Sequence, residues 1–242
     1  LPTWLRRQRQ MCIRDSATAG AIRYITRPIA DSNEGEAELT LGSDRRRDIK
    51  GLANWAINED SALRASLTSR RQAGYITNPD TDQEFGDQNT LAGRLAFAQQ
   101  LSPSLTGTVT LERSRIRTQG APSLLISVNH DAPFVNQEAN AGFDARALPA
   151  PALNRSYQTG ANFLHSDSEG AGLSLTWQQA PFTGKYRGHF RALDIQGAYD
   201  TDATHASLFE QNYHRKLRMQ SHEVTLEREQ AQSRWLAGLY HY

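Results

Sequence analysis

The sequence predicts an all-β protein: an antiparallel meander forming part of a large transmembrane β-barrel, with about nine strands present and the barrel incomplete. Three observations predict this fold class. Apolar and polar residues alternate along many segments, most of these segments are longer than the strands of soluble sheets, and short and long connections alternate along the chain. A transmembrane helix is excluded, because the chain has no run of about 18 apolar residues.

Alternation with a period of two is clearest at residues 105–112. Leu105 and Leu111 are expected on one side of a strand, and Thr106 and Glu112 on the other, because successive strand side chains point to opposite faces. The same pattern recurs at 36–41, 63–68, 91–97, 171–178 and 223–227. Each of these segments is therefore predicted to be a strand with one apolar and one polar side.

Turn residues divide the chain into strands expected, in order, near 35–42, 47–58, 62–72, 89–100, 105–116, 169–179, 185–199, 216–229 and 235–242. Most of them are about 9–15 residues long, whereas strands of soluble sheets have about 5–6. A tilted strand needs about 9–11 residues to cross a bilayer. The lengths therefore favour a membrane barrel.

The connections are expected to be sorted by length between the two ends of the sheet. Short turns fall near 58–61, 101–104, 180–184 and 231–234, and long polar loops near 73–88, 117–168 and 200–215; the first connection, 43–47, is short. Alternate connections of an antiparallel meander lie at the same end. Short turns at one end and long loops at the other are typical of outer-membrane barrels.

Aromatic residues fall toward the predicted strand ends, where a membrane barrel carries its aromatic girdles. This set consists of Trp55, Tyr75, Phe97, Trp177, Tyr186, Phe190, Trp235 and Tyr240. The alternative for any one of them is an ordinary core aromatic.

Composition excludes several classes of protein. The formal net charge of +1 gives no overall field that favours nucleic acid. The single cysteine, Cys12, allows neither a disulfide framework nor a cysteine-based metal site. The 38% of hydrophobic residues would by itself suggest a soluble protein; the strand pattern is what favours the membrane.

The segment ATAGAIRYITRP, residues 17–28, resembles the last strand of the plug domain in TonB-dependent outer-membrane receptors. The matching positions are Gly20, Ala21, Ile22, Tyr24, Ile25, Thr26 and Pro28, with one residue fewer before the proline than is common in that family. Residues 35–58, 63–97 and 221–242 are similar to barrel hairpins of the same receptors.

This resemblance implies three parts of the chain. Residues 17–30 would be the C-terminal end of a plug domain, and 31–242 a partial receptor barrel. Residues 1–16 contain Met-Cys-Ile-Arg-Asp-Ser, which matches a translated sequencing adaptor, so they are expected to be an artefact or disordered. A genuine basic N-terminal arm is the alternative. Further strands are expected to close the barrel, because an open sheet edge has no partners in lipid.

The resemblance further implies a function. A receptor of this family lies in the outer membrane of a Gram-negative bacterium and actively imports a scarce nutrient with energy from the TonB system. The usual cargo is a ferric siderophore, and the alternatives are cobalamin, haem or an oligosaccharide. Its partners would be outer-membrane lipid, a TonB-type energy-transducing complex and a small-molecule nutrient such as an iron chelate, with no nucleic acid. The resemblance implies no cofactor and no enzymatic reaction.

Two sets of residues are candidates for contact with the cargo. The loop at 117–168 would capture it through arginine and aromatic groups suited to an anionic chelate; these are Arg117, His130, Phe134, Phe143, Arg146 and Tyr157. The polar strand faces would line the lumen, with Glu36, Glu38, Arg64, Arg94, Thr106, Thr110, Glu112, Glu223 and Glu227.

No catalytic motif is present: the sequence lacks HExxH, GxSxG, a Walker loop and GxGxxG. Residues 80–86 resemble a calcium loop only weakly, because the glycine comes one place late and position twelve is Leu91; a plain acidic loop is favoured. Two other functions stay open: a passive porin-like barrel, and a secreted soluble β-domain that binds carbohydrate.

Overall fold

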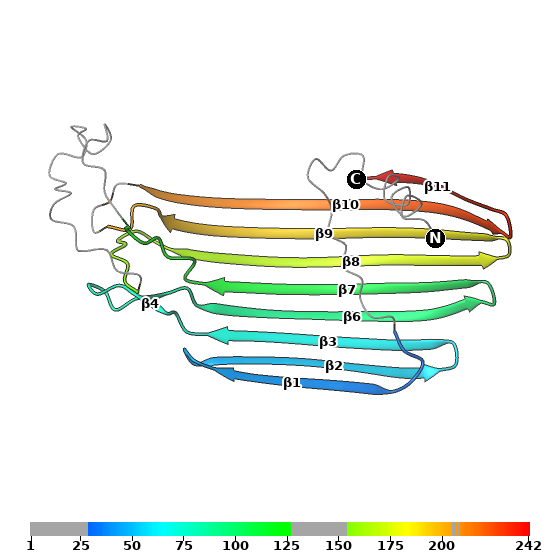
Figure 1. Cartoon of the computed structure of the whole chain (residues 1–242), viewed down its shortest axis with the longest axis horizontal. Coiled ribbons are helices and arrows are strands. Elements are labelled where there is room, and N and C mark those ends of the chain that lie inside the picture. The colour runs from blue at the N-terminus through cyan, green and yellow to red at the C-terminus, as the bar shows by residue number, and fades with distance from the viewer. Residues whose placement is uncertain (1–28, 127–153, 205–206, 208) are drawn as a thin grey trace.

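The computed structural model describes residues 29–126, 154–204, 207 and 209–242. Its main element is a nine-stranded antiparallel sheet in the order β1-β2-β3-β6-β7-β8-β9-β10-β11 (Figure 1). The strands are β1 (Glu34–Gly42), β2 (Arg46–Asn58), β3 (Ser61–Gln72), β6 (Gln88–Ser102), β7 (Leu105–Thr118), β8 (Phe163–Gln179), β9 (Phe182–Asp200), β10 (Glu210–Gln230) and β11 (Ser233–His241). A two-stranded sheet pairs β4 (Ile76–Thr77) with β5 (Glu84–Phe85). The all-β meander is thus confirmed.

The connections are sorted as the sequence predicts. Turns of two residues join the strands at 59–60, 103–104, 180–181 and 231–232, all at the right-hand end in Figure 1. The three-residue turn 43–45 and the connections 73–87, 119–162 and 201–209 belong to the opposite end. We call these the turn end and the loop end of the sheet.

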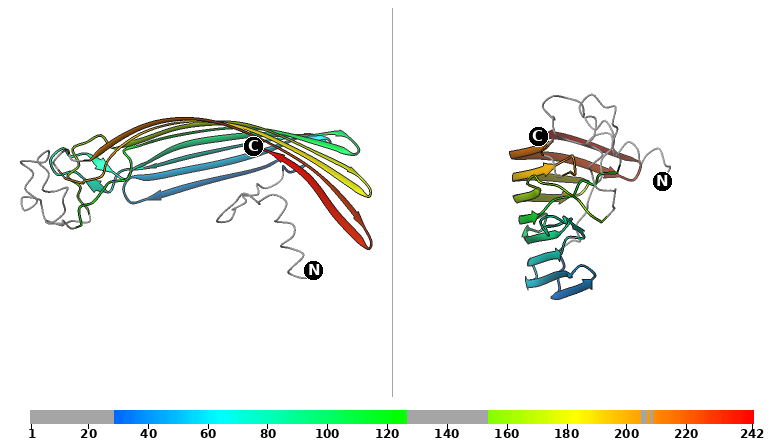
Figure 2. Two further views of the ribbon diagram at one scale, coloured as in Figure 1. Left: turned by 90° about the horizontal axis from the view of Figure 1, so that it is seen from above. Right: turned by 90° about the vertical axis from the view of Figure 1, so that its left-hand side faces the viewer.

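The sheet is open and curved (Figure 2). In the described part of the chain, β1 and β11 each pair with one neighbour only. The same part contains no helix long and apolar enough to cross a membrane. The backbone amides and carbonyls on the outer sides of these two edge strands have no strand partner in the described residues, so both edges offer hydrogen-bonding groups to a further strand.

The register divides the side chains between two faces. Residues directly opposite one another in neighbouring strands share a face. One row contains Gly35, Ala53, Ala65, Leu95, Leu111, Ala171 and Phe190, and defines what we call the apolar face. The adjacent row contains Glu36, Leu52, Ser66, Arg94, Glu112, Gly170 and Arg191, and defines the polar face.

No second layer covers the apolar face in the described residues. Large aliphatic side chains in the middle of the sheet stay exposed, among them Leu111 at 53% and Val224 at 50%. The buried apolar side chains of the described residues are mostly alanines, with Ile76 and Phe85 from the β4–β5 hairpin. A water-soluble sandwich would hide such leucines between two sheets, whereas here they lie on a face that the described residues leave uncovered.

The apolar residues form a band that crosses the strands obliquely. One cross-strand row shows this directly, because it is largely apolar at one side of the sheet and charged at the other. Its members, in sheet order, are Leu39, Ile49, Ser69, Leu91, Arg115, Asp167, Asp194 and Lys216.

The slope of this band follows from the register. The apolar stretch of β2 begins at Ile49, whose row reaches Lys216 in β10, but the apolar stretch of β10 begins only at Val224. The start of the apolar stretch is thus displaced along β10 from Lys216 to Val224, a distance of about 27 Å. The distance across the sheet from β2 to β10, six strand spacings, is about 29 Å. The band therefore lies at about 43° to the cross-strand rows, which agrees with the strand tilt of about 35–45° in outer-membrane barrels.

Some strands are longer than the sequence indicates. β8 begins at Phe163 rather than near 169, and β10 begins at Glu210 rather than near 216. Apart from Phe163, Leu164 and Tyr213, these extensions are polar on both faces, so they lack the alternation by which the other strand segments are recognised. They form because β8, β9 and β10 continue to pair beyond the apolar band.

The eight aromatic residues that the sequence assigns to girdles do not all lie on the apolar face. Trp55, Phe97, Trp177, Tyr186, Phe190 and Trp235 lie on the apolar face. Tyr240 lies on the polar face, because its row partner is Glu223, and Tyr75 lies in the loop between β3 and β4, beside Gly86. The prediction that all eight belong to girdles is wrong for these two.

Candidate functional site

The polar face contains all nine side chains that the sequence assigns to a polar lining. Register places Glu36, Glu38, Arg64, Arg94, Thr106, Thr110, Glu112, Glu223 and Glu227 on this one face. The strands therefore present a continuous polar surface opposite the apolar face, formed by residues of β1, β3, β6, β7 and β10.

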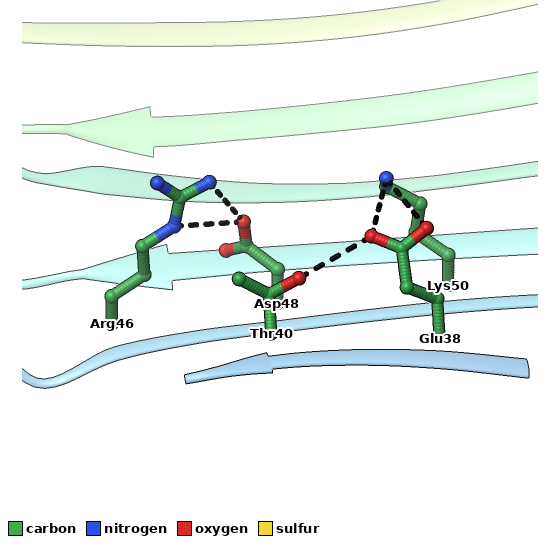
Figure 3. A network of polar contacts seen from close by, with 5 residues as sticks. All are labelled: Glu38, Thr40, Arg46, Asp48 and Lys50. Atoms are coloured by element: carbon green, nitrogen blue, oxygen red, sulfur yellow. Dashed lines mark hydrogen bonds and ion pairs between the residues drawn. The ribbon is translucent and has the colours of Figure 1, made fainter. Parts of the chain in front are cut away.

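Charges near the β1 edge are paired with one another (Figure 3). The Lys50 ammonium donates to both oxygens of Glu38 at 2.9 and 3.1 Å, and Thr40 donates to Glu38 at 3.3 Å. Arg46 donates to Asp48 from Nε at 3.0 Å and from Nη2 at 2.7 Å. These contacts pair the charged groups of the four residues on the polar face, although the second Asp48 oxygen, Oδ1, is buried and has no hydrogen-bond partner in the described part of the chain.

A depression of about 300 Å³ lies farther along the polar face and is the candidate ligand site of the strands. Arg94, Glu112 and Arg191 contribute to its lining, together with Ser66, Thr68 and Ser168. Arg191 donates to Glu112 although β8 lies between their strands. Gly170, which faces both residues in β8, makes this contact possible, since a Cβ there would lie 2.9 Å from Glu112 Oε1.

The segment that precedes β1 is held on the polar face by Asn54. Its side-chain amide donates to the carbonyls of Ala30 and Ser32, both at 2.8 Å, and its oxygen accepts from the Ala30 amide at 3.3 Å and from Arg64 Nε at 3.1 Å. Asn54 is 1% exposed and Arg64 is 7% exposed. Arg64 also pairs with Glu34 at 2.7 Å. The chain therefore enters the sheet from its polar side.

A second buried polar cluster joins connections at the loop end. The Asp200 carboxylate accepts from the amides of Thr159 and Gly160, both at 3.1 Å, and its backbone carbonyl accepts from Gln158 Nε2 at 2.7 Å and Ser123 Oγ at 2.8 Å. Asn78, from the β4–β5 hairpin, donates to the Gln158 carbonyl at 2.7 Å. This loop cluster thus links segments from two connections to the end of β9.

Burial raises the pKa of the Asp200 carboxyl above its ordinary value of 3.8, although the Gly160 amide acts in the opposite direction. The raised pKa means that the folded loops favour the protonated acid. The contribution of this group to loop stability is therefore complete below pH 3.8 and is lost as the pH rises through the raised pKa.

We expect the Thr159 and Gly160 amides to be less protected from hydrogen exchange at about pH 7 than at about pH 4, after correction for intrinsic exchange rates. An Asp200→Asn variant should show no such change in protection, because it cannot titrate. An equal pH dependence in the variant and the wild type would contradict this role of Asp200.

Two of the six predicted loop residues can be placed. Arg117 lies at the end of β7 and donates to the Asp167 carboxylate and to the Ile116 carbonyl, the latter at 2.7 Å. Tyr157 is half-buried between Ser156 and Gln158 of the loop cluster. His130, Phe134, Phe143 and Arg146 lie outside the described residues, as does the plug-like motif of Gly20, Ala21, Ile22, Tyr24, Ile25, Thr26 and Pro28.

The acidic loop at 80–86 is stabilised by contacts within the protein. Glu84 pairs with Arg45 at 2.8 Å, and Asn78 Oδ1 accepts from the Asp80 amide at 2.9 Å. Within residues 29–126, 154–204, 207 and 209–242, no three His, Cys, Asp or Glu side chains are grouped so as to hold a metal ion.

Comparisons by sequence find no relative: no protein-family model matches the chain, and no curated protein matches it. Comparison by structure does find similar folds. The ferric yersiniabactin uptake receptor FyuA from Yersinia pestis is 10% identical and aligns with a TM-score of 0.68 over 89% of this chain and 31% of its own. The ferric-catecholate import receptor Fiu from Escherichia coli K12, in its closed form, is 10% identical and aligns with a TM-score of 0.57 over 82% of this chain and 29% of its own.

The chain therefore spans less than a third of the length of either receptor. At this level of identity the likeness shows the fold alone. The nine strands are arranged like a section of a β-barrel receptor.

Proposed function

We propose that this chain is part of a TonB-dependent receptor that imports a ferric siderophore across the outer membrane of a Gram-negative bacterium. One observation carries the proposal: the oblique apolar band has the slope that tilted strands need to present a level belt to a bilayer. The sorted turns and loops support it, and so do the functions of the two similar receptors, which take up ferric chelates.

In this proposal the polar face lines the interior of a barrel that further strands complete. Residues 31–242 form barrel, residues 17–30 form the end of a plug domain, and residues 1–16 are an adaptor artefact. The contacts of Asn54 with residues 30 and 32 support this division, because they bring the chain to the polar side, where a plug would lie. The plug supplies the gate and the TonB-type complex supplies the energy. The receptor therefore needs no chemical step or cofactor of its own.

Uptake of labelled iron chelates tests the proposal. A strain that lacks its own siderophore receptors and expresses the complete receptor should accumulate a ferric siderophore only while the energy-transducing complex is intact. Accumulation without that complex, together with swelling of proteoliposomes in sugar solutions, would indicate a passive porin instead. A detergent-free protein in the aqueous phase that retains carbohydrate would indicate the secreted binding domain.

We further propose that the loop residues Arg117, His130, Phe134, Phe143, Arg146 and Tyr157 bind the cargo. Arg146→Ala should weaken binding of the transported chelate about tenfold, because an arginine–anion contact contributes about 1.5 kcal/mol or more. Arg117→Ala should have a smaller effect, since Arg117 already pairs with Asp167. Calorimetry on the complete receptor measures both affinities, and unchanged affinity in both variants would exclude this role for the two arginines.

A further inference from the structure

An open groove of about 650 Å³ lies on the sheet between two rows of the apolar face. Gly51, Leu67, Gly93 and Arg113 contribute one row, and Ala53, Ala65, Leu95 and Leu111 contribute the other. The row between them, whose side chains belong to the polar face, also contributes to the lining, with Glu36, Leu52, Ser66, Arg94 and Glu112. Small residues on β2 and β3 make the groove, since larger side chains surround it at Trp55, Phe97 and Leu91. The groove runs across four strands within the oblique apolar band.

Two glycines keep this groove open without being required by the backbone. A Cβ on Gly51 would meet no atom within 4 Å, and a Cβ on Gly93 would lie 3.8 Å from Leu67 Cδ1 and from the Ser66 carbonyl oxygen. Both residues lie inside regular strands. A Cβ is therefore accommodated at either position, and a larger side chain there would extend into the groove.

Arginines lie on the charged side of the band, and one of them, Arg113, lines the groove. Arg113 closes one end of the groove, and Arg47, Arg71 and Arg115 lie on the same face in β2, β3 and β7. All four are exposed, and none of them has a hydrogen bond or ion pair with the described part of the chain.

Acidic residues are distributed unevenly on this face. Glu169 lies across from Arg113 in β8, on the side away from the groove. The face of β1, β2, β3 and β6 that holds the groove contains no Asp or Glu. The groove is thus apolar inside and positively charged along one border.

We propose that this groove binds a membrane lipid with a net negative, phosphate-bearing headgroup, whose acyl chain occupies the groove and whose phosphate is held by Arg113. The inference rests on the proposed function in one respect: the apolar face must lie in a bilayer. Charge complementarity supports a lipid as occupant, because an acyl chain ending in an anion matches an apolar groove ending in unpaired guanidinium groups. Guanidinium groups bind phosphate in two-pronged contacts, and arginines at a membrane border attract anionic headgroups.

Lipid retention on the purified receptor tests this inference. The complete receptor, extracted in a mild detergent, is incubated with lipid A, a bisphosphorylated glycolipid, or with zwitterionic phosphatidylethanolamine, and retained lipid is counted by native mass spectrometry. Arg113→Gln should lower lipid A retention about fivefold. Gly93→Leu should lower it to the level of phosphatidylethanolamine, and Gly51→Leu provides a second test of the groove should Gly93→Leu fold poorly.

Arg218→Gln is the matched control, because Arg218 is an exposed arginine on the same face in β10 that does not border the groove. Its lipid A retention should equal that of the wild type. Unchanged retention in Arg113→Gln, unchanged retention in the folded glycine variants, or an equal loss in Arg218→Gln would each overturn the proposal. Normal siderophore uptake combined with any of these results would leave the transport function standing, whereas specific retention without uptake would refute only the transport function.

Discussion

A Val109→Arg substitution is expected to lower the free energy of unfolding of the complete barrel by about 2–4 kcal/mol. Val109 lies inside the oblique apolar band, between Phe97 in β6 and Leu173 in β8, with 46% of its surface exposed. If this face lies in a bilayer, the substitution places a guanidinium group in hydrocarbon, where it has no water and no counterion. Leu175→Arg, two residues farther along β8, should have a comparable effect.

The neighbouring threonines provide the control. Thr108 and Thr176 point to the polar face, so Thr108→Arg and Thr176→Arg should cost far less than the changes on the apolar face. Reversible folding into lipid vesicles, followed by tryptophan fluorescence in denaturant, gives the four free energies. Equal costs on both faces would refute the membrane orientation, and with it the proposed transport function.

The strands and their facing could be predicted from the sequence because they depend on local alternation. Val109 and Leu111 alternate with Thr108 and Thr110 within one segment, and their facing does not depend on any distant partner. The oblique band could not be predicted in this way. It depends on the register between β7 and β8, which are separated by more than forty residues, and on every pairing from β2 to β10.

The two buried polar clusters also escaped prediction from sequence. Asn54 occurs in a strand where an amide looks like any other polar-face residue, and its partners lie 22 and 24 residues earlier in the chain. Asp200 contacts residues about 40 positions away. Polar side chains reveal such roles only when folding has removed them from water, because exposed and buried amides have the same sequence pattern.

Asn54→Ala is expected to destabilise the attachment of residues 30–33 to the sheet by about 2–4 kcal/mol. The substitution removes three hydrogen bonds to the backbone of Ala30 and Ser32. It also deprives Arg64 Nε of its acceptor in a place where the side chain is almost fully buried. The loss of a buried hydrogen bond costs stability because little water reaches the Arg64 side chain to replace the missing acceptor.

Hydrogen exchange at the Ala30 amide measures this attachment directly, because that amide donates to Asn54. Its protection should fall in Asn54→Ala by the factor that corresponds to 2–4 kcal/mol, about 30- to 900-fold. Lys50→Gln is the control: Lys50 lies on the same strand and face, but its partner Glu38 is exposed, and such surface pairs contribute about 0–1 kcal/mol. Full protection of the Ala30 amide in Asn54→Ala would show that the segment is held by the pairing of β1 with β2, and that Asn54 does not direct the chain to the polar face.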